Sequence, residues 1–263
     1  MGHEDVGIVG GFLHSDNTYA VCAKGMHANC QHGGYDGSQA EKIRILNADG
    51  TLLATPGQPH ADLIPSLLAL SDVMATGWHA AVSADVQPGS SVVVVGDGAV
   101  GLSGVLAAAP LGATTIIAMS RHASRQQVAK DFGATHVVAE RGDEGLAQVR
   151  ELTDGVGADS VLECVGTEDA RAQAVAYARP GGMIGPVGVP HGDLPTDQIF
   201  WANKGVRCGP APVRAYLPHL LDLVLRREID PGRVFDVTLP LADVAEAYAA
   251  MDERRAIKVL LQP

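Results

Sequence analysis

The sequence has no apolar run long enough to cross a membrane, no internal repeat and no low-complexity segment. Residues 1–5 carry neither the basic start nor the apolar stretch of a secretory signal peptide. Cationic residues are also scarce, since 19 Lys and Arg stand against 30 Asp and Glu, for a net charge of −11. A chain this acidic is a poor match for nucleic acid or for an anionic membrane surface. We therefore expect a cytoplasmic protein that has neither as a partner.

Cysteine is rare as well. The four cysteines, at positions 22, 30, 164 and 208, do not make a disulfide framework in a chain of 263 residues. This length is enough for one large domain or two small ones. A hydrophobic content of 46% with 19% charged residues is ordinary for a globular protein. The composition thus predicts a globular protein with a sizeable buried core.

The most specific motif is a run of four valines followed by a glycine-rich turn. Valine occupies residues 92–95, which suits a strand buried on both faces of a parallel sheet. A G-x-G-x-x-G motif follows directly, and its candidate binding residues are Gly96, Gly98, Ala99, Val100 and Gly101. In this context the glycines allow a tight turn, close approach of a pyrophosphate and close helix–strand packing. The helix start supplies N–H groups to the phosphates, so the motif predicts a dinucleotide site.

The next predicted strand lacks the acidic residue that usually ends it in NAD-binding proteins. No carboxylate occurs between Gly101 and Asp131, although an Asp or Glu at this strand end normally binds the 2′-hydroxyl of the adenosine ribose. Ser120, Arg121 and Arg125 stand there instead, and hydroxyl and guanidinium groups suit a 2′-phosphate. The alternative is that both arginines are solvated ends of the following helix. The pattern favours NADP(H) over NAD(H).

Apolar strands and helical patterns alternate through the middle of the chain. The predicted strands are residues 92–95, 114–119, 135–139, 160–164 and 182–188. The predicted helices include residues 102–111, 123–132, 145–152 and 168–178. Alternation of this kind predicts an α/β fold with a doubly wound parallel sheet. Outside this region we expect a strand-like piece at 40–46, an amphipathic helix at 216–227 and a last strand at 257–261.

Short motifs along the whole chain resemble one protein family. They are Gly2-His3-Glu4, the spaced pair Cys22 and Cys30, residues 70–80, residues 96–101, residues 162–166, residues 180–182, residues 185–188 and residues 257–259. In this order they resemble the zinc-type medium-chain dehydrogenase/reductase superfamily, and most of all its bacterial alcohol dehydrogenases. The Ser120-Arg121 pair is similar to that of the NADP-dependent branch. The resemblance implies a Rossmann-like domain paired with a GroES-like, β-rich catalytic domain.

The resemblance also implies that much of the catalytic domain is absent from this chain. In the family, Gly-His-Glu lies behind several strands that carry the first cysteine ligand, and further barrel strands follow it. We therefore expect residues 1–82 to be a reduced GroES-like domain. Residues 83–212 are expected to form the NADP-binding domain, and residues 213–263 a helix and a return to the catalytic domain.

For the catalytic metal, the resemblance maps His3 and Asp72 onto ligand positions, with Glu4 as an alternative ligand or a neighbour of the ligands. A zinc of this kind has three protein ligands and one open position, where it acts as a Lewis acid on an alcohol or carbonyl oxygen. Thr76 follows Asp72 by one helical turn and is expected near the nicotinamide. The alternatives are that His3 belongs to a frayed terminus and that Asp72 caps the next helix.

The family's structural zinc lobe is retained only in part. Counting back from Cys22 and Cys30 places the first two ligand positions at Asp16 and Tyr19. Aspartate is an acceptable zinc ligand, whereas tyrosine is a poor one. One interpretation is a rearranged site of Asp16, Cys22, Cys30 and a histidine, since His27 lies between the cysteines and His32 just after them. The other is a metal-free loop with two reduced thiols.

The resemblance places the nicotinamide at Val165, Gly166 and Gly188, whose backbone groups follow two neighbouring strands. It implies an NADP(H)-dependent alcohol dehydrogenase that interconverts small alcohols with aldehydes or ketones, as a dimer or tetramer. The absent strands leave a second interpretation open, an NADP(H)-binding protein without activity. A third, the zinc-independent reduction of an alkene or quinone, is disfavoured by Gly-His-Glu and Asp72.

Overall fold

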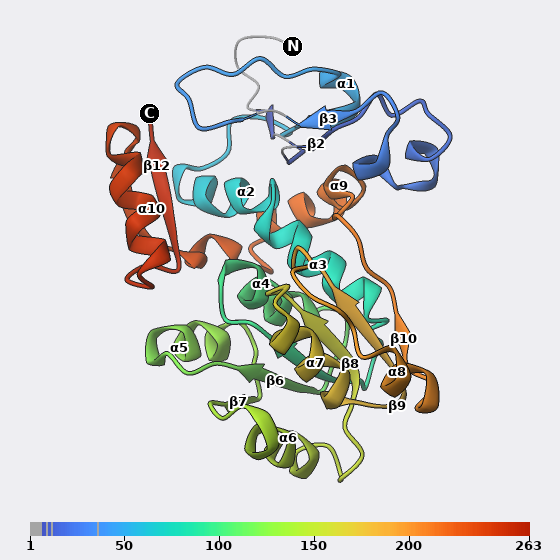
Figure 1. Ribbon diagram of the computed structural model, residues 1–263. Coiled ribbons are helices and arrows are strands. Elements are labelled where there is room, and N and C mark those ends of the chain that lie inside the picture. The colour runs from blue at the N-terminus through green and yellow to red at the C-terminus, as the bar shows by residue number, and fades with distance from the viewer. Residues whose placement is uncertain (1–6, 9, 12, 36) are drawn as a thin grey trace. The chain divides into compact units, whose positions relative to one another are not determined.

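The computed structural model describes residues 7–8, 10–11, 13–35 and 37–263. The chain forms two compact units (Figure 1). One unit is Thr76–Pro210, and the other combines the residues before Thr76 with Ala211–Pro263. The domain boundaries expected after residues 82 and 212 stay a prediction, because packing alone defines these units.

The unit Thr76–Pro210 is built on one six-stranded sheet. Its strands are β5 (Ser91–Val95), β6 (Thr115–Met119), β7 (His136–Val138), β8 (Ala158–Glu163), β9 (Ala178–Pro186) and β10 (Gly205–Val206). All neighbours are parallel, in the order β10-β9-β8-β5-β6-β7. The chain therefore starts in the middle and winds outward in both directions, which is the Rossmann arrangement. The predicted fold class, an α/β fold with a doubly wound parallel sheet, is confirmed.

The valine strand lies at the centre of this sheet. Strand β5 pairs with β6 on one side and β8 on the other. Val92, Val93 and Val94 are fully buried and Val95 is 3% exposed. Burial of each such side chain stabilises the fold by about 1.5–3 kcal/mol. A strand covered on both faces thus explains the uninterrupted apolar run in the sequence.

Helices cover both faces of the sheet. On one side α4 (Ala99–Ala108) packs against α5 (Ala123–Asp131), and on the other α6 (Gly142–Glu151) packs against α7 (Glu168–Tyr177). The core under α6 and α7 combines side chains of both helices with side chains from strands β5 to β9. The remaining helices that lie in or enter this unit are α3 (Val73–Ser83) and α8 (Thr196–Trp201). No described helix is both long enough and apolar enough to span a membrane.

The described residues of the other unit form three sheets of two strands each. The pairs are β1 (Gly7–Ile8) with β4 (Leu53–Ala54), β2 (Leu13–His14) with β3 (Gly34–Tyr35), and β11 (Phe235–Pro240) with β12 (Lys258–Gln262). Its α-helices are α1 (Ala48–Thr51), α2 (Ile64–Leu70), α9 (Val213–Leu225) and α10 (Val244–Asp252). Short 3-10 helices are η1 (Cys22–Lys24), η2 (His27–Asn29), η3 (Ala61–Leu63), η4 (Pro231–Val234) and η5 (Leu241–Asp243).

Packing against α2 joins the first and last parts of the chain in this unit, and a second packing contact lies within the last part. Helix α2 packs against α9 and η4. There the Ser66 hydroxyl donates to Asp230 Oδ1 at 2.6 Å and accepts from the Gly232 N–H at 3.0 Å. Helix α10 covers β12 through Ala247, Ala250 and Val259. The unit is therefore a single structure made of two separate stretches of sequence.

One predicted element is wrong. Residues 40–46 were expected to be strand-like, but none of them belongs to a strand. Ile43 and Leu46 are 39% and 41% exposed. The alternation of apolar and charged residues gives a strand only where a partner strand and a buried face exist, and this loop has neither among the described residues.

Candidate cofactor and metal sites

The glycine-rich turn joins the end of β5 to the start of α4. Gly96 has a φ of 114°, in the left-handed region that glycine adopts readily. A Cβ at Gly101 would lie 2.0 Å from the Gly96 carbonyl oxygen, so helix and strand meet with no room for a side chain. At Gly98, the N-cap of α4, no atom of the described residues other than its chain neighbours lies within 4 Å of where a Cβ would be. The turn thus combines open space with the N–H groups of Ala99 and Val100, a geometry that fits a pyrophosphate.

A carboxylate from this turn reaches the end of the neighbouring strand β6. Ser120 Oγ donates to Asp97 Oδ2 at 2.8 Å, and Arg125 Nη1 lies 3.3 Å from Asp97 Oδ1. Ser120 is completely buried, while the side chains of Arg125 and Asp97 are 9% and 15% exposed. Arg121 is exposed and takes no part in these bonds. Of the three groups predicted to bind a 2′-phosphate, two therefore already bind a carboxylate and one faces solvent.

The residues predicted for the nicotinamide surround Glu163 at the end of β8. Glu163 Oε1 accepts hydrogen bonds from the N–H groups of Val165 and Gly166, both at 2.7 Å. Its main-chain carbonyl accepts from the Gly188 N–H at 3.2 Å. Glu163 is completely buried, and its Oε2 has no hydrogen-bond partner among the described residues. Strands β5 and β8 are the neighbours at which the winding reverses, which is where sheets of this kind bind ligands.

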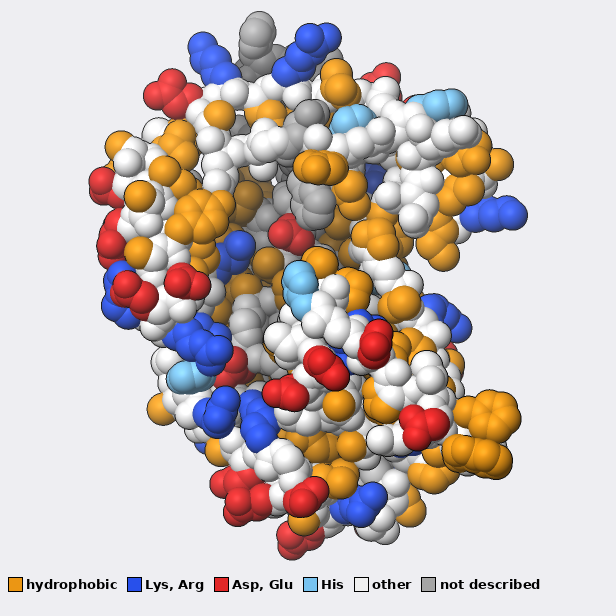
Figure 2. All heavy atoms as spheres, viewed as in Figure 1, with side chains coloured by type: hydrophobic (Ala, Val, Ile, Leu, Met, Phe, Trp, Pro, Cys, Tyr) orange, Lys and Arg blue, Asp and Glu red, His pale blue; other side chains and the backbone are white. Residues whose placement is uncertain are grey.

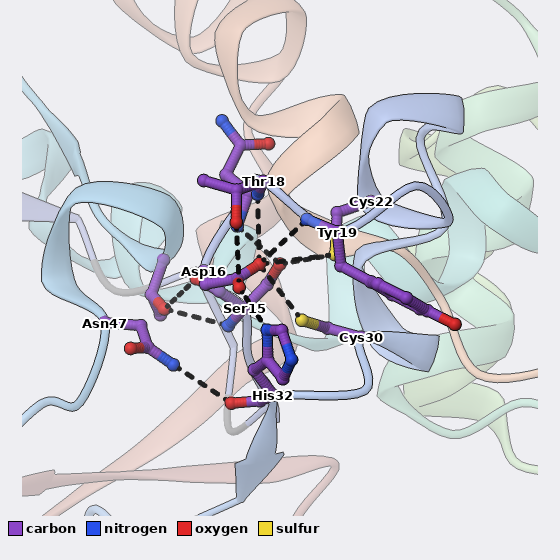
Figure 3. Close-up of polar contacts among 10 residues, drawn as sticks. Ser15, Asp16, Thr18, Tyr19, Cys22, Cys30, His32 and Asn47 are labelled. Atoms are coloured by element: carbon purple, nitrogen blue, oxygen red, sulfur yellow. Dashed lines mark hydrogen bonds and ion pairs between the residues drawn. The ribbon is translucent and has the colours of Figure 1, made fainter.

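The three residues predicted for the second metal lie together (Figure 3). One ligand atom from each of Asp16, Cys22 and Cys30 lies within 4.8 Å of the others. Asp16 Oδ1 is 3.4 Å from Cys30 Sγ and 3.9 Å from Cys22 Sγ. His32 Nδ1 is hydrogen-bonded to Asp16 Oδ2 at 2.6 Å. Tyr19, at a predicted ligand position, instead places its ring 5.8 Å from the ring of His32.

Hydrogen bonds in this loop favour the ionised forms of two of these groups. The backbone N–H of Thr18, followed by His32, holds the pKa of the Asp16 carboxyl well below its usual range. Burial raises the pKa of the Cys22 thiol. Burial acts in the same direction on Cys30, but hydrogen bonds from the Asp16 N–H and the Cys22 thiol outweigh it and lower the pKa of Cys30. A carboxylate and two closely spaced sulfurs, one of them with a lowered pKa, form a donor set that fits zinc.

The structure describes only two of the four predicted catalytic residues, Asp72 and Thr76. His3 and Glu4 lie outside the described residues. Asp72 directly precedes α3, and Thr76 follows it by one turn of that helix. Asp72 lines a cavity of about 390 Å³, all of whose walls belong to the unit that contains Ala211–Pro263. Its apolar walls include Leu68, Phe235, Leu241, Tyr248, Met251 and Leu261. In the described part of the chain, Asp72 belongs to no group of three potential metal ligands.

Two acidic residues that shape these sites were not singled out in the sequence. Asp97 lies inside the glycine motif, whereas a ribose-binding acid is expected at the end of the next strand, after Gly101. Glu163 lies within residues 162–166, which carry the family resemblance and imply no role for this side chain. A charged residue at the end of an apolar run is a signal that would have found it, because such a residue is buried only when its charge is hydrogen-bonded.

The strand order, the glycine turn and the backbone groups gathered at the end of β8 define a Rossmann-type nucleotide-binding domain of the kind found in dehydrogenases. Known proteins are similar to it. Residues 99–208 match the family model described as zinc-binding dehydrogenase. The structure of the alcohol dehydrogenase TADH from Thermus sp. ATN1 superimposes with a TM-score of 0.89 at 29% identity, covering 98% of this chain and 77% of that one.

Two relatives extend this similarity. A zinc-type alcohol dehydrogenase-like protein of Bacillus subtilis, itself described as uncharacterized, is 32% identical over 259 residues, which cover 89% of this chain and 68% of that protein. The NADP-dependent isopropanol dehydrogenase of Clostridium beijerinckii is 33% identical over 209 residues, which cover 76% of this chain and 58% of that enzyme. The chain belongs to the zinc-type medium-chain dehydrogenase/reductase superfamily, as its motifs predict. It spans 57% and 56% of the lengths of two further relatives, from Aspergillus flavus and Mycobacterium tuberculosis.

Proposed function

We propose that the chain binds NADP(H) and transfers a hydride between the nicotinamide and a small alcohol, aldehyde or ketone. The observation that carries this proposal is the open space at Gly98, where α4 begins beside the strand pair β5 and β8. Sheets of this order bind dinucleotides at that place. Membership of the zinc-type superfamily supports alcohol chemistry, and the similar isopropanol dehydrogenase is NADP-dependent.

Each part of the cofactor has chain groups to bind it. The proposed binding residues are Gly96, Gly98, Ala99, Val100, Gly101, Ser120, Arg121, Arg125, Val165, Gly166 and Gly188. The first five bind the pyrophosphate through the turn and the start of α4. Glu163 fixes the loop at Val165 and Gly166, whose backbone groups orient the carboxamide. When bound, the cofactor supplies the hydride acceptor or donor.

Two metal sites complete the proposal. His3, Glu4 and Asp72 are the proposed ligands of a catalytic zinc, with Thr76 beside the nicotinamide. A zinc there polarises the substrate oxygen when it is bound. The second site consists of Asp16, Cys22 and Cys30, and His32 is hydrogen-bonded to the Asp16 carboxylate beside them. A closed site of this kind stabilises its loop and takes no part in the chemistry.

Cofactor titration combined with metal analysis and turnover tests this function. We expect NADPH fluorescence to change on binding, zinc to be present, and NADPH to be oxidised in the presence of at least one member of a panel of aldehydes and ketones. Tight NADPH binding without turnover would support the alternative of a cofactor-binding protein without activity. Absence of NADPH and NADH binding would contradict both.

We also propose that the chain is a homo-oligomer. The two-residue strand β10 lies at the edge of the six-stranded sheet, directly after α8. Phe200 and Trp201 at the end of α8 are 71% and 82% exposed, with their rings 5.2 Å apart. Apolar side chains project from the surface at this end of the sheet (Figure 2). An exposed sheet edge beside such side chains favours association with a second copy.

A further inference from the structure

The carboxylate of Asp97 lies beside Ser120 at the end of β6, the strand end toward which folds of this kind direct the adenosine ribose. A dinucleotide whose pyrophosphate rests at Gly98 extends its adenosine half toward the end of the next strand, β6. Ser120 directly follows β6, and its hydroxyl is bonded to Asp97 at 2.8 Å. An acidic group therefore does occupy the ribose end of the site, although it comes from the glycine turn instead of the strand.

From this placement we infer that Asp97 sets the choice between NAD(H) and NADP(H); the inference rests on the proposed function. Asp97 binds both Ser120 and Arg125, two of the three groups that would otherwise be offered to a 2′-phosphate. A ribose 2′-hydroxyl can donate a hydrogen bond to the carboxylate, as it does to the acid at the strand end of NAD-binding proteins. A 2′-phosphate meets the same carboxylate as a like charge.

The other cations near this point do not cancel the effect. Arg141 donates through Nη2 to the Met119 carbonyl at 3.0 Å and through Nη1 to the carbonyls of Ala139 and Glu140 at 3.2 and 2.9 Å. Its guanidinium is thus committed to the backbone at the ends of β6 and β7. Arg121 is left as the exposed cation available to a phosphate. Because the Asp97 carboxylate lies beside this arginine and is already paired with Arg125, we expect its charge to weaken the preference for NADP(H) without abolishing it.

The substitution Asp97→Asn tests this inference. It keeps the size of the side chain and an oxygen that can accept from Ser120, and it removes the negative charge. Arg125 retains a hydrogen bond to the main-chain oxygen of residue 97, at 3.3 Å in the wild type. We expect the ratio of NADPH to NADH affinity to rise by about fivefold or more, because a like charge is removed from the phosphate site.

The affinities are measured by fluorescence titration of the full chain with NADPH and with NADH, so no turnover is needed. Asp131→Asn is the matched control, since Asp131 is exposed at the end of α5 and the same change in net charge is expected to leave the ratio unchanged. Thermal unfolding without cofactor shows whether each variant folds, and Asp97→Ser replaces Asp97→Asn if the latter does not.

The outcomes separate this inference from the proposed function. A shift toward NADPH in the Asp97 variant and not in the control supports it. A shift smaller than about fivefold, a shift toward NADH, or an equal shift in Asp131→Asn overturns it while cofactor binding stands. Failure of the wild type to bind either cofactor would instead remove the proposed function, and with it the basis of this inference.

Discussion

Glu163 determines the backbone geometry at the end of β8. It lies in the centre of the sheet, completely buried, and one carboxylate oxygen accepts from two consecutive N–H groups. The same residue's carbonyl accepts from Gly188. A buried carboxylate is retained in a protein interior when it is hydrogen-bonded in this way. Its side chain thus fixes two predicted cofactor residues, and its main-chain carbonyl fixes a third.

Truncation of this side chain should therefore destabilise the protein. In Glu163→Ala the N–H groups of Val165 and Gly166 lose their acceptor, and we expect the free energy of unfolding to fall by about 2–4 kcal/mol. Urea denaturation measures this loss. Glu168→Ala, at an exposed position in the first turn of α7, is the control and should cost less than about 1 kcal/mol. Equal stabilities of the two variants would contradict the role given to Glu163.

The cysteines allow a second test at the scale of single residues. Cys30 has a lowered pKa and lies in the Asp16 cluster, whereas Cys208 is exposed and lies outside it. Cys30→Ser should reduce the zinc content of the purified protein, because serine is a much poorer zinc ligand than a thiolate. Cys208→Ser should leave it unchanged. Mass spectrometry measures the zinc content of the two variants. Equal zinc in both would show that the loop of Asp16, Cys22 and Cys30 does not bind the metal.

At the scale of elements, the turn before α4 contains one glycine that the fold requires and another that the proposed cofactor requires. Gly98 has φ −78° and free space around it, so alanine fits there without strain. Gly101 has no such space, since a Cβ would contact the Gly96 carbonyl. Gly98→Ala should therefore leave the melting temperature nearly unchanged and weaken NADPH binding by at least about tenfold, because the methyl group lies where the pyrophosphate would rest.

Gly101→Ala is the matched comparison for this prediction. It should lower the melting temperature by several degrees, as expected for a loss of about 1–3 kcal/mol from overpacking. Differential scanning fluorimetry with and without NADPH measures both effects. If Gly98→Ala bound NADPH like the wild type, the pyrophosphate would have to lie elsewhere.

Five of the six strands of the large sheet could be predicted from the sequence because each is an apolar run bounded by glycine or polar residues, whereas the two-residue strand β10 carries no such pattern. The helix predicted at 123–132 is observed as Ala123–Asp131, and the strand predicted at 114–119 as Thr115–Met119. The short strands of the other unit could not be found, since a pair such as β1 and β4 has two residues per strand and a partner about 45 positions away. The pattern of apolar and polar residues within one short segment does not indicate which distant segment will pair with it.

The candidate sites likewise include parts that could be predicted from the sequence and parts that could not. The glycine turn was predictable because backbone conformation requires those glycines at that spacing. The pairing of Asp97 with Ser120 was not, because it joins residues of two neighbouring strand ends and depends on side-chain geometry. The cluster of Asp16 with the two cysteines was predicted through the resemblance, and the structure brings the three together.

At the scale of the whole molecule, the exposed aromatic pair on α8 predicts self-association. The double substitution Phe200→Ser and Trp201→Ser should shift the protein toward monomer, because it removes apolar surface beside the sheet edge. Light scattering coupled to size-exclusion chromatography measures the mass. Tyr248→Ser, which changes an aromatic side chain on α10 that is 53% exposed, serves as the control. A wild-type monomer would contradict the prediction.

The central strand β5 also governs how the chain can fold. Its neighbour β6 follows it after one helix, but its other neighbour, β8, begins only at Ala158. Contacts of such long range form slowly, because loop-closure entropy must be overcome first. Until both neighbours arrive, four adjacent valines are exposed with open backbone edges, which favours pairing between chains. Refolding yield should therefore fall steeply as the protein concentration is raised.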